Sequence, residues 1–366
     1  MGAELSLGAA PGPGSVQHFS PWLGAAGPWL AAQAMEHWQR PILAIVSSAR
    51  ELDVWVREWR FFAPEWGEAL VFPDRDILPY DRLSPPAEAT ATRLATLAAL
   101  PRWRGLCVTS VAAALQKLPP ASFLDQHALV LRRGDHLEPA RFRQRLVDAG
   151  YRAVAEVSEP GELAWRGGII DLFPSGSAVP YRIELFDQEV ESIRSFDPES
   201  QRSLEPVDQV TTLPAREVPV DADALQAFRA RFRARFSGDP QRAEIYRRAS
   251  QGTVPAGAEH YLPLFFEAPG KLWDFLPRDT LVLTPPGLTE AEAQVRADWH
   301  ERYEEHRHDP AHPLLSPEEL LWDAATWQAD LSLRGRLAES SGTTAQALPL
   351  AAPPPLQADL DQPLAG

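Results

Sequence analysis

Short apolar runs alternate with amphipathic segments through the first third of the chain. Three apolar runs predict buried strands, at 41–48 (PILAIVSS), 69–73 (ALVFP) and 105–110 (GLCVTS). The segments that follow them predict helices, at 49–62, 86–100 and 111–117. Strands that alternate with helices in this way indicate a parallel sheet with helices on its faces. The first part of the chain therefore predicts an α/β domain.

The hydrophobic pattern changes after Pro119 and Pro120. A strand at 127–133 and a helix at 138–149 are followed only by strands, which the pattern predicts at 151–157, 162–174, 180–186 and 189–196. Asp187 and Gln188 can form the turn that joins the last two strands into a hairpin. One helix with several consecutive strands indicates an α+β unit with an antiparallel sheet.

Alternation returns near Thr212, with further elements predicted as helix 224–236, strand 280–285 and helix 288–306. We interpret these elements as the second half of the first domain, so that the α+β unit is an insertion. The predicted boundaries are 1–121 for the first half, 122–211 for the insert, 212–338 for the second half and 339–366 for a linker.

Composition narrows the functional classes. The chain has 366 residues, 45% of them hydrophobic, which is enough for two or three domains at about 150 residues each. A net charge of −15 disfavours the DNA backbone as a main partner, because that contact relies on clustered cations. The single cysteine, Cys107, excludes an intrachain disulfide and fits a reducing compartment. With no apolar run of about 20 residues, we expect a cytoplasmic protein without a membrane partner.

The stretch LGAAGPWLAA, residues 23–32, lies where a nucleotide-binding domain carries its phosphate loop. A functional loop reads GxxxxGK[ST], in which the lysine neutralises phosphate and the hydroxyl binds Mg²⁺. Counting from Gly24, Trp29 replaces the second glycine, Leu30 the lysine and Ala31 the hydroxyl residue. From the residues alone, the stretch is either a phosphate loop that has lost its chemistry or an ordinary turn. No nucleotide binding is expected in either case.

No other motif predicts a catalytic residue, a metal site or a cofactor. The histidines between 300 and 312 have neither the HExxH spacing nor a His/Cys zinc spacing, which favours a solvated helix end. The acidic residues at 74–76 stand among proline and apolar neighbours, which favours turn capping over metal binding. We therefore expect no catalytic residue, no metal and no cofactor.

Three longer segments resemble the amino-terminal region of the bacterial transcription-repair coupling factors. They cover 71–97, which contains LPYD and SPP, 166–203, which contains RGGIIDLFP and RIELFD, and 252–266, which contains AGAEHYLPLFF. The second segment is also similar to the excision-repair protein UvrB. The resemblance runs in order from about residue 17 to 335.

This resemblance implies a fold, and it implies that the family's motor region is not part of this sequence. The expected fold is an α/β, parallel-sheet, UvrB-like domain with a degenerate phosphate loop, interrupted by an inserted α+β domain with an antiparallel sheet. The family's motor has its own phosphate loop and acidic box, which do not occur in this sequence. The chain is therefore expected to be part of a longer protein, with RNA polymerase and DNA bound only through the missing regions.

The resemblance also implies a partner, UvrA, bound by the insert. In the family, the contacts correspond to Arg166, Arg182 and Phe186, and the surface is masked in the whole protein. Period-2 alternation places Arg182 and Phe186 on the polar face of the strand at 180–186. From the residues alone, Phe186 is either an exposed binding residue or one covered by a neighbouring element. The expected function is a non-catalytic module that recruits UvrA to stalled RNA polymerase; the alternative is an active UvrB-like ATPase that loads onto DNA.

Overall fold

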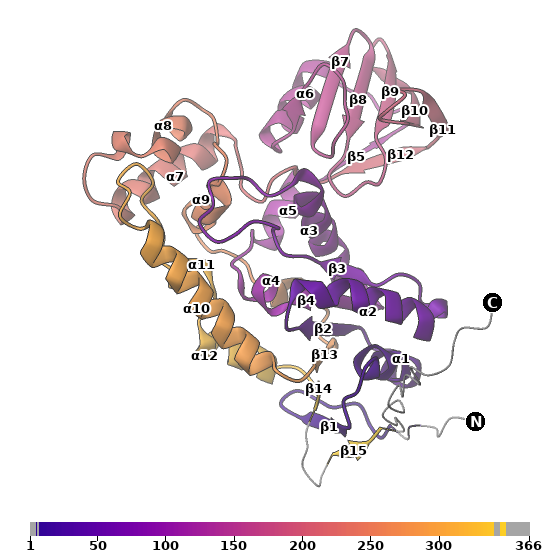
Figure 1. Cartoon of the computed structure of the whole chain (residues 1–366). Helices are drawn as coiled ribbons and strands as arrows, with labels where there is room; N and C mark the ends of the chain where they lie inside the picture. Colours follow the sequence, from indigo (N-terminus) through magenta and orange to yellow (C-terminus); the bar gives the residue numbers. More distant parts are fainter. Residues whose placement is uncertain (1–4, 6, 340–344, 349–366) are drawn as a thin grey trace, which may run out of the picture.

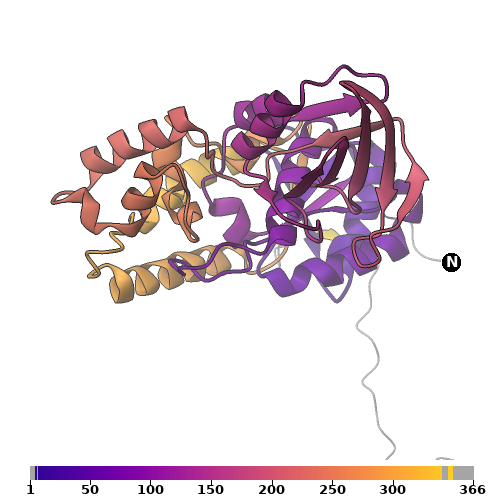
Figure 2. The same cartoon turned by 90° about the horizontal axis from the view of Figure 1, so that it is seen from above.

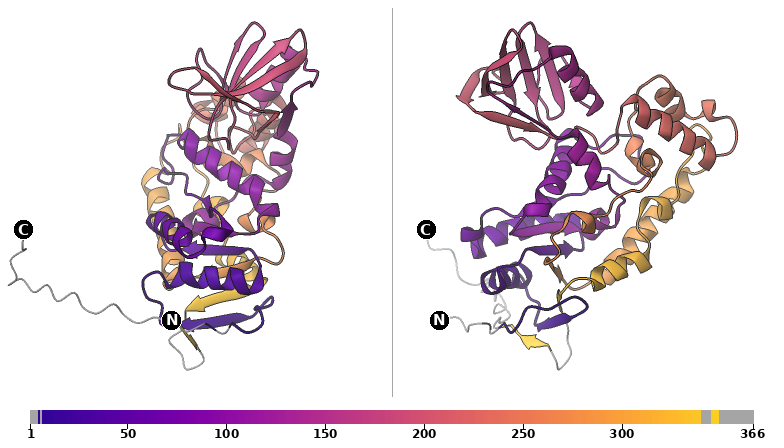
Figure 3. Two further views of the ribbon diagram at one scale, coloured as in Figure 1. Left: turned by 90° about the vertical axis from the view of Figure 1, so that its right-hand side faces the viewer. Right: turned by 180° about the vertical axis from the view of Figure 1, so that it is seen from behind.

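The computed structural model describes residues 5, 7–339 and 345–348. Two bodies make up this part of the chain, a larger one built on a parallel sheet and a smaller one formed by the insert (Figure 1). The insert and a helical lobe that contains α7 (Ala222–Arg235) and α8 (Glu244–Ser250) project from the same side of the larger body (Figures 1 and 3). The expected fold class, α/β with an inserted antiparallel sheet, is confirmed.

The larger body is organised around a sheet of seven described strands in the order β15-β1-β14-β13-β2-β4-β3, and all of their pairings are parallel. The central strands β2 and β4 are buried at every position, as expected for a parallel sheet covered on both faces. Its strands are β1 Val16–Ser20, β2 Ile42–Val46, β3 Leu70–Phe72, β4 Leu106–Ser110, β13 Leu281–Thr284, β14 Arg336–Glu339 and β15 Gln346–Ala347.

Alternation along each strand divides the larger body into two hydrophobic cores. In β2, Leu43 and Ile45 contribute to one core, and Ala44 and Val46 to the other. The second core is closed by α1 and α2, which pack against each other, while the first contains residues of α3, α4, α7 and α10. These helices are α1 Ala26–Trp38, α2 Ala49–Phe62, α3 Ala87–Ala99, α4 Val111–Leu115 and α10 Leu288–His306.

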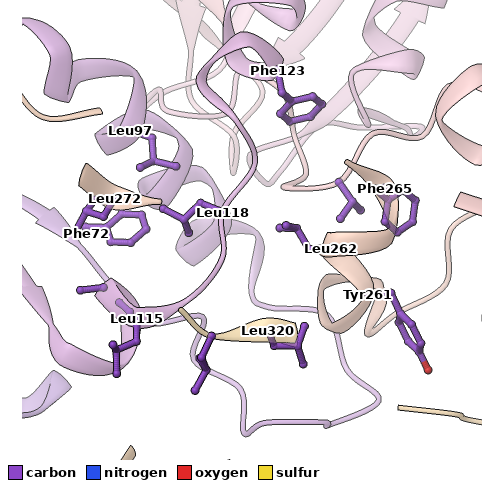
Figure 4. Packing of buried hydrophobic residues seen from close by; sticks show 14 of the residues in the cluster. Phe72, Leu97, Leu115, Leu118, Phe123, Tyr261, Leu262, Phe265, Leu272 and Leu320 are labelled. Atoms are coloured by element: carbon purple, nitrogen blue, oxygen red, sulfur yellow. The ribbon is translucent and has the colours of Figure 1, made fainter. Parts of the chain in front are cut away.

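The first core joins segments that lie far apart in the sequence. Figure 4 shows Leu115 and Leu118 from the first half of the domain facing Leu262, Phe265 and Leu320 from the second half. Phe228 and Phe232 of α7 belong to this core. The ring of Phe228 stacks on that of Phe265, and the ring of Phe232 is tilted against that of Tyr246. The remaining helices here are α5 Ala121–His127, α9 Leu262–Phe265, α11 Pro317–Leu320 and α12 Ala324–Ser332.

The insert contains two small sheets and a helix, and Figure 2 shows it over the end of the larger body. A six-stranded sheet of described residues, in the order β11-β10-β9-β8-β7-β6, packs α6 onto one face through residues such as Leu146 and Ile183. A separate antiparallel pair joins β5 to β12. The elements are β5 Leu129–Arg132, α6 Pro139–Asp148, β6 Arg152–Ala153, β7 Glu162–Arg166, β8 Ile169–Phe173, β9 Tyr181–Phe186, β10 Glu189–Phe196, β11 Ser203–Pro206 and β12 Gln209–Thr212.

Three sequence predictions differ from the structure. The single strand predicted at 162–174 is two strands, β7 and β8, because Gly167 takes a φ of +60° and reverses the chain. The strand predicted at 151–157 is only the two-residue β6. The linker predicted from 339 contains strand β15, which pairs with β1; most of its other residues lie outside the described part.

The two connections to the insert lie side by side. Leu129, at the start of β5, is the cross-strand partner of Thr212, at the end of β12. Helix α5, just ahead of β5, contributes Phe123 and Leu124 to the core of the larger body. Helices α3 and α5 lie between the sheet and the insert (Figure 1). The boundaries of 122 and 211 stay a prediction.

Just after β12, a buried ion cluster ties the returning chain to the larger body. Arg75 donates to Glu217 Oε2 at 2.8 and 2.5 Å, and Arg93 donates to Glu217 Oε1 at 2.5 Å. Arg93 also lies over the ring of Phe72, 4.3 Å from its centroid. Burial by itself raises the pKa of Glu217, but the two guanidinium groups outweigh burial and lower that pKa to about 2. Residue 217 is therefore a charged anchor at the exit of the insert.

Excision of the insert tests whether the larger body folds without it. Replacing residues 129–212 by a short Gly/Ser bridge should leave a folded larger body, because paired residues of antiparallel strands have Cα atoms only about 5 Å apart. The variant should keep a helical circular dichroism spectrum and unfold cooperatively on heating. Loss of cooperative unfolding would show that the larger body needs the insert in order to fold.

The buried anchor predicts an acid-sensitive stability. The folded pKa of Glu217 lies below its ordinary value of 4.5, so its contribution is complete above about pH 4.5 and is lost as the pH falls toward 2. Glu217→Ala leaves two buried guanidinium groups without their carboxylate and should lower the free energy of unfolding by about 3–5 kcal/mol at pH 7. Urea titrations at pH 7 and pH 3 measure both effects.

Glu68→Ala is the matched control for Glu217→Ala. Glu68 pairs with Arg60 on the surface, where both side chains are more than half exposed, so its removal should change the free energy of unfolding by less than about 1 kcal/mol. Equal losses in the two variants would contradict the anchoring role of Glu217.

Candidate functional site

The stretch at 23–32 lies between a strand and a helix, in the position of a phosphate loop. It follows β1, which the sequence pattern did not predict, and enters α1. Leu30 and Ala31, the positions of the missing lysine and hydroxyl, are fully buried in the core beneath α1. A Cβ on Gly27 would lie 2.5 Å from the ring of Trp55, so an indole occupies the space beside the helix start. Trp29 packs against the same core.

This geometry gives the loop a packing role. Gly24 takes a φ of +50° at the turn before α1, so the loop keeps a sharp turn. The side chains that would neutralise phosphate and hold Mg²⁺ are replaced by buried apolar groups. A nucleotide placed here would have to displace packed side chains and would find no cation at positions 30 and 31.

The second candidate site lies on the face of the six-stranded sheet opposite α6. Its centre is Asp171 in β8, a fully buried carboxylate that sequence reasoning did not single out. Arg166 of β7 donates to Asp171 Oδ2 at 2.6 Å, and Arg182 of β9 donates to Oδ1 and Oδ2 at 2.6 and 2.9 Å. One carboxylate therefore brings together two of the three residues that the family resemblance implies.

Strand register explains this cluster. Asp171 lies directly opposite Arg182, and Ile169, two residues before it on the same face, lies opposite Arg166. The turn at Gly167 sets the pairing of β7 with β8, and it therefore decides which residues of β8 lie on the same face as Arg166. The sequence does contain a sign of this role. Asp171 is a charged residue in the middle of the apolar run IIDLF, and each of the two neighbouring strands carries an arginine.

The two arginines differ in exposure. The Arg166 side chain is 52% exposed, whereas that of Arg182 is only 18% exposed. Arg182 also donates to the carbonyl of Gln201 at 3.1 Å and lies 4.9 Å from the ring centroid of Phe196. Its hydrogen bonds with Asp171 raise the pKa of Arg182. Arg182 therefore lies on the predicted face but is not freely exposed, because its donors are engaged within the insert.

Phe186 ends β9 and is 74% exposed, so no other element of the described chain covers it. It lies on the same face as Arg182, two residues beyond Glu184. Ile169 is diagonal to it and is also exposed, at 37%. The site is thus an apolar pair beside a held arginine, on a solvent-facing sheet surface.

The motifs LPYD and AGAEHY, by contrast, pack against each other. A Cβ on Gly257, whose φ is +79°, would lie 3.2 Å from the carbonyl oxygen of Asp81. The buried rings of Tyr80 and His260 have centroids 5.8 Å apart and line a pocket of about 460 Å³. Burial lowers the pKa of His260 to about 3, so its ring is neutral at physiological pH. These motifs shape the interior of the larger body.

Other chemistry is not evident in the described part of the chain. No group of three or more His, Cys, Asp or Glu side chains among the described residues could hold a metal ion. Burial raises the pKa of Cys107 to about 12, which keeps this thiol protonated and unreactive. None of the described helices combines the length and the apolar character that crossing a membrane requires.

The insert that carries the second site matches a known protein family. Residues 129–218 match the family model of the UvrB interaction domain. This range contains Arg166, Asp171, Arg182 and Phe186, and it ends one residue beyond Glu217. The insert is therefore similar to the UvrB interaction domain over these residues.

Curated relatives then identify the family. The chain is 42% identical over 249 residues to the transcription-repair-coupling factor of Escherichia coli K12, a match that covers 68% of this chain and 22% of that protein. The factor of Haemophilus influenzae is 40% identical over 257 residues, with 69% and 22% covered. That of Bacillus subtilis is 32% identical over 229 residues, with 58% and 20% covered. The chain belongs to the transcription-repair coupling factor family, as the sequence motifs indicated, and spans about a fifth of the length of these relatives.

The geometry of the first site predicts that the chain does not bind ATP. Isothermal titration with ATP and Mg²⁺ should show no saturable heat, because Leu30 and Ala31 supply neither charge nor ligand and are buried. The Leu30→Lys, Ala31→Thr variant should lose stability without gaining affinity, since it places a charge and a hydroxyl in a packed core. Saturable, Mg²⁺-dependent ATP binding by the unmodified chain would contradict this assignment.

Proposed function

We propose that this chain is a non-catalytic interaction module that recruits UvrA to RNA polymerase stalled on damaged DNA. Membership of the transcription-repair coupling factor family supports a role in nucleotide excision repair. The observation that carries the proposal is the exposed Phe186 beside the arginines held by Asp171, within the matched UvrB interaction domain. Exposed aromatic and arginine side chains are the residue types that contribute most to protein interfaces.

The same surface suggests regulation in a longer protein. Phe186 and its diagonal neighbour Ile169 leave two adjacent apolar side chains exposed on one face of the sheet, and a covering segment would remove both from water. We propose that other parts of a coupling factor mask it until the motor engages DNA, and that RNA polymerase and DNA bind through those other parts. The cytoplasm is the proposed location, where the single buried thiol stays reduced.

The alternative function, an ATPase that loads onto DNA, has no support in the geometry. It requires a cation and a hydroxyl at positions 30 and 31, where the chain has buried apolar side chains. We therefore propose no catalytic role for the described residues.

Calorimetric titration of UvrA into the chain tests the proposal. Arg166→Ala and Phe186→Ala should each weaken binding by about 2 kcal/mol, or about 30-fold in Kd, because they remove exposed contact groups. Their melting temperatures should stay near that of the unmodified chain, since Phe186 is exposed and Asp171 keeps Arg182 as a partner when Arg166 is removed.

Two further variants serve as controls for the UvrA titration. Arg194→Ala removes an exposed arginine from the neighbouring strand β10, opposite Arg182, and should leave the affinity nearly unchanged. Ile183→Ala, on the buried face, should lower the melting temperature first. Unchanged affinity in both Arg166→Ala and Phe186→Ala would remove this surface from the binding site.

A further inference from the structure

We propose that the surface divides into a contact strip of Arg166, Ile169 and Phe186 and a buried support of Asp171 and Arg182, which acts on the partner only by positioning Arg166. This inference rests on the proposed function and deepens it. It assigns a contact role to Ile169 and a positioning role to Asp171, and it gives Arg182 a different role from that of Arg166.

The support follows from the hydrogen bonds of Arg182. Its Nε and Nη2 donate to Asp171, and its Nη1 donates to the carbonyl of Gln201. All three nitrogens are thus engaged within the insert, and the side chain is 18% exposed. A partner carboxylate approaching Arg182 would have to compete with Asp171, a fully buried carboxylate that is already paired with it. Asp171 itself cannot touch a partner.

Arg166 is in a different position. It donates to Asp171 through Nη2, and the structure describes no other hydrogen bond from its guanidinium group. Half of the side chain is exposed, so the remaining donors can form a charge-assisted pair with a partner carboxylate. Asp171 fixes the guanidinium at the sheet surface and so removes part of the entropic cost of holding an arginine in one orientation.

The apolar part of the strip follows from register. Ile169 lies directly opposite Arg166, at about 5 Å between Cβ atoms, and Phe186 is its diagonal neighbour on β9, at about 7–8 Å. Gly168 allows the turn to approach β9 closely, since a Cβ there would lie 3.0 Å from the carbonyl oxygen of Leu185. The strip therefore presents one cation followed by two apolar side chains.

The partner segment that fits this strip carries one carboxylate next to one or two apolar side chains. Glu184 lies directly opposite Ile169 and two residues before Phe186 on the same face, and it accepts a hydrogen bond from Ser192 at 2.7 Å. Its negative charge disfavours a second carboxylate at the apolar end of the strip. The acidic group of the partner is therefore placed at the Arg166 end.

A double-mutant cycle with UvrA tests the division of roles. In the unmodified background, Asp171→Asn and Arg182→Ala should each weaken UvrA binding about tenfold, because Arg166 loses its fixed orientation. In the Arg166→Ala background, either change should add less than about twofold. A purely structural role would instead give the same loss in both backgrounds. Arg182→Lys, which keeps a cation near Asp171, should restore part of the affinity.

Ile169 has its own matched pair of variants. Ile169→Thr should weaken UvrA binding about fivefold without lowering the melting temperature. Leu204→Thr, which removes an exposed leucine from the edge strand β11 of the same sheet, should leave the affinity unchanged. Equal effects of the two changes would overturn the contact role of Ile169.

The possible outcomes separate this inference from the proposed function. If the unmodified chain does not bind UvrA, the proposed function and the contact strip both fail. If it binds, and Arg182→Ala is additive with Arg166→Ala, then Arg182 acts on UvrA binding independently of Arg166, and only the division of roles is overturned. A measurement without UvrA checks the support: the NMR signal of the Arg182 Nε–H should be protected from solvent exchange, and Asp171→Asn should abolish this protection. Fast exchange in the unmodified chain would overturn the support.

Discussion

One interaction recurs in both bodies of this structure: a buried carboxylate shared by two arginines. Glu217 joins Arg75 and Arg93 where the chain leaves the insert, and Asp171 joins two arginines on the open face of the insert. A buried carboxylate that lost these partners would be left as an unpaired charge, which costs several kcal/mol. The position of each arginine is therefore strongly specified. The first cluster fixes where the insert is attached, and the second fixes what it presents.

The larger body acts as a scaffold. Its parallel sheet and the turn before α1 have the layout of a nucleotide-binding domain, but the catalytic positions of the loop are filled by packing groups. Two indoles close the space beside Gly27, whose hypothetical Cβ would meet Trp55 at 2.5 Å and Trp22 at 3.3 Å. The phosphate-loop positions of this fold are thus used for packing, and the proposed partner surface belongs to the insert.

The motifs that identify the family and the residues that face solvent serve different purposes. LPYD and AGAEHY meet in the interior, where Gly257 permits close backbone approach and Tyr80 and His260 are buried. Their distinctive sequences reflect steric and aromatic packing. The exposed residue of greatest interest, Phe186, stands in the less conspicuous strand PYRIELF, in which simple alternation of apolar and polar residues determines its face.

A structural feature could be predicted from the sequence when the residues that form it lie close together along the chain. Helices α2 and α10 are found at 49–62 and 288–306 as predicted, and the hairpin at Asp187 and Gln188 is confirmed. These features were predictable because helical periodicity and turn chemistry act over a few residues. Strand β1 was missed, since its sequence VQHFS has no apolar run and becomes a strand only by pairing with β14 and β15.

The candidate site shows the same division. The sequence by itself determined the fold class, the alternation that puts Arg182 and Phe186 on one face, and the loss of phosphate-binding chemistry at Leu30 and Ala31. Only the tertiary structure decided that Arg182 is engaged and Arg166 is open, because both depend on Asp171 in a third strand. That arrangement follows from the turn at Gly167, which changes the face on which every later residue of β8 lies. Register between strands is a contact between distant parts of the chain, and no local pattern encodes it.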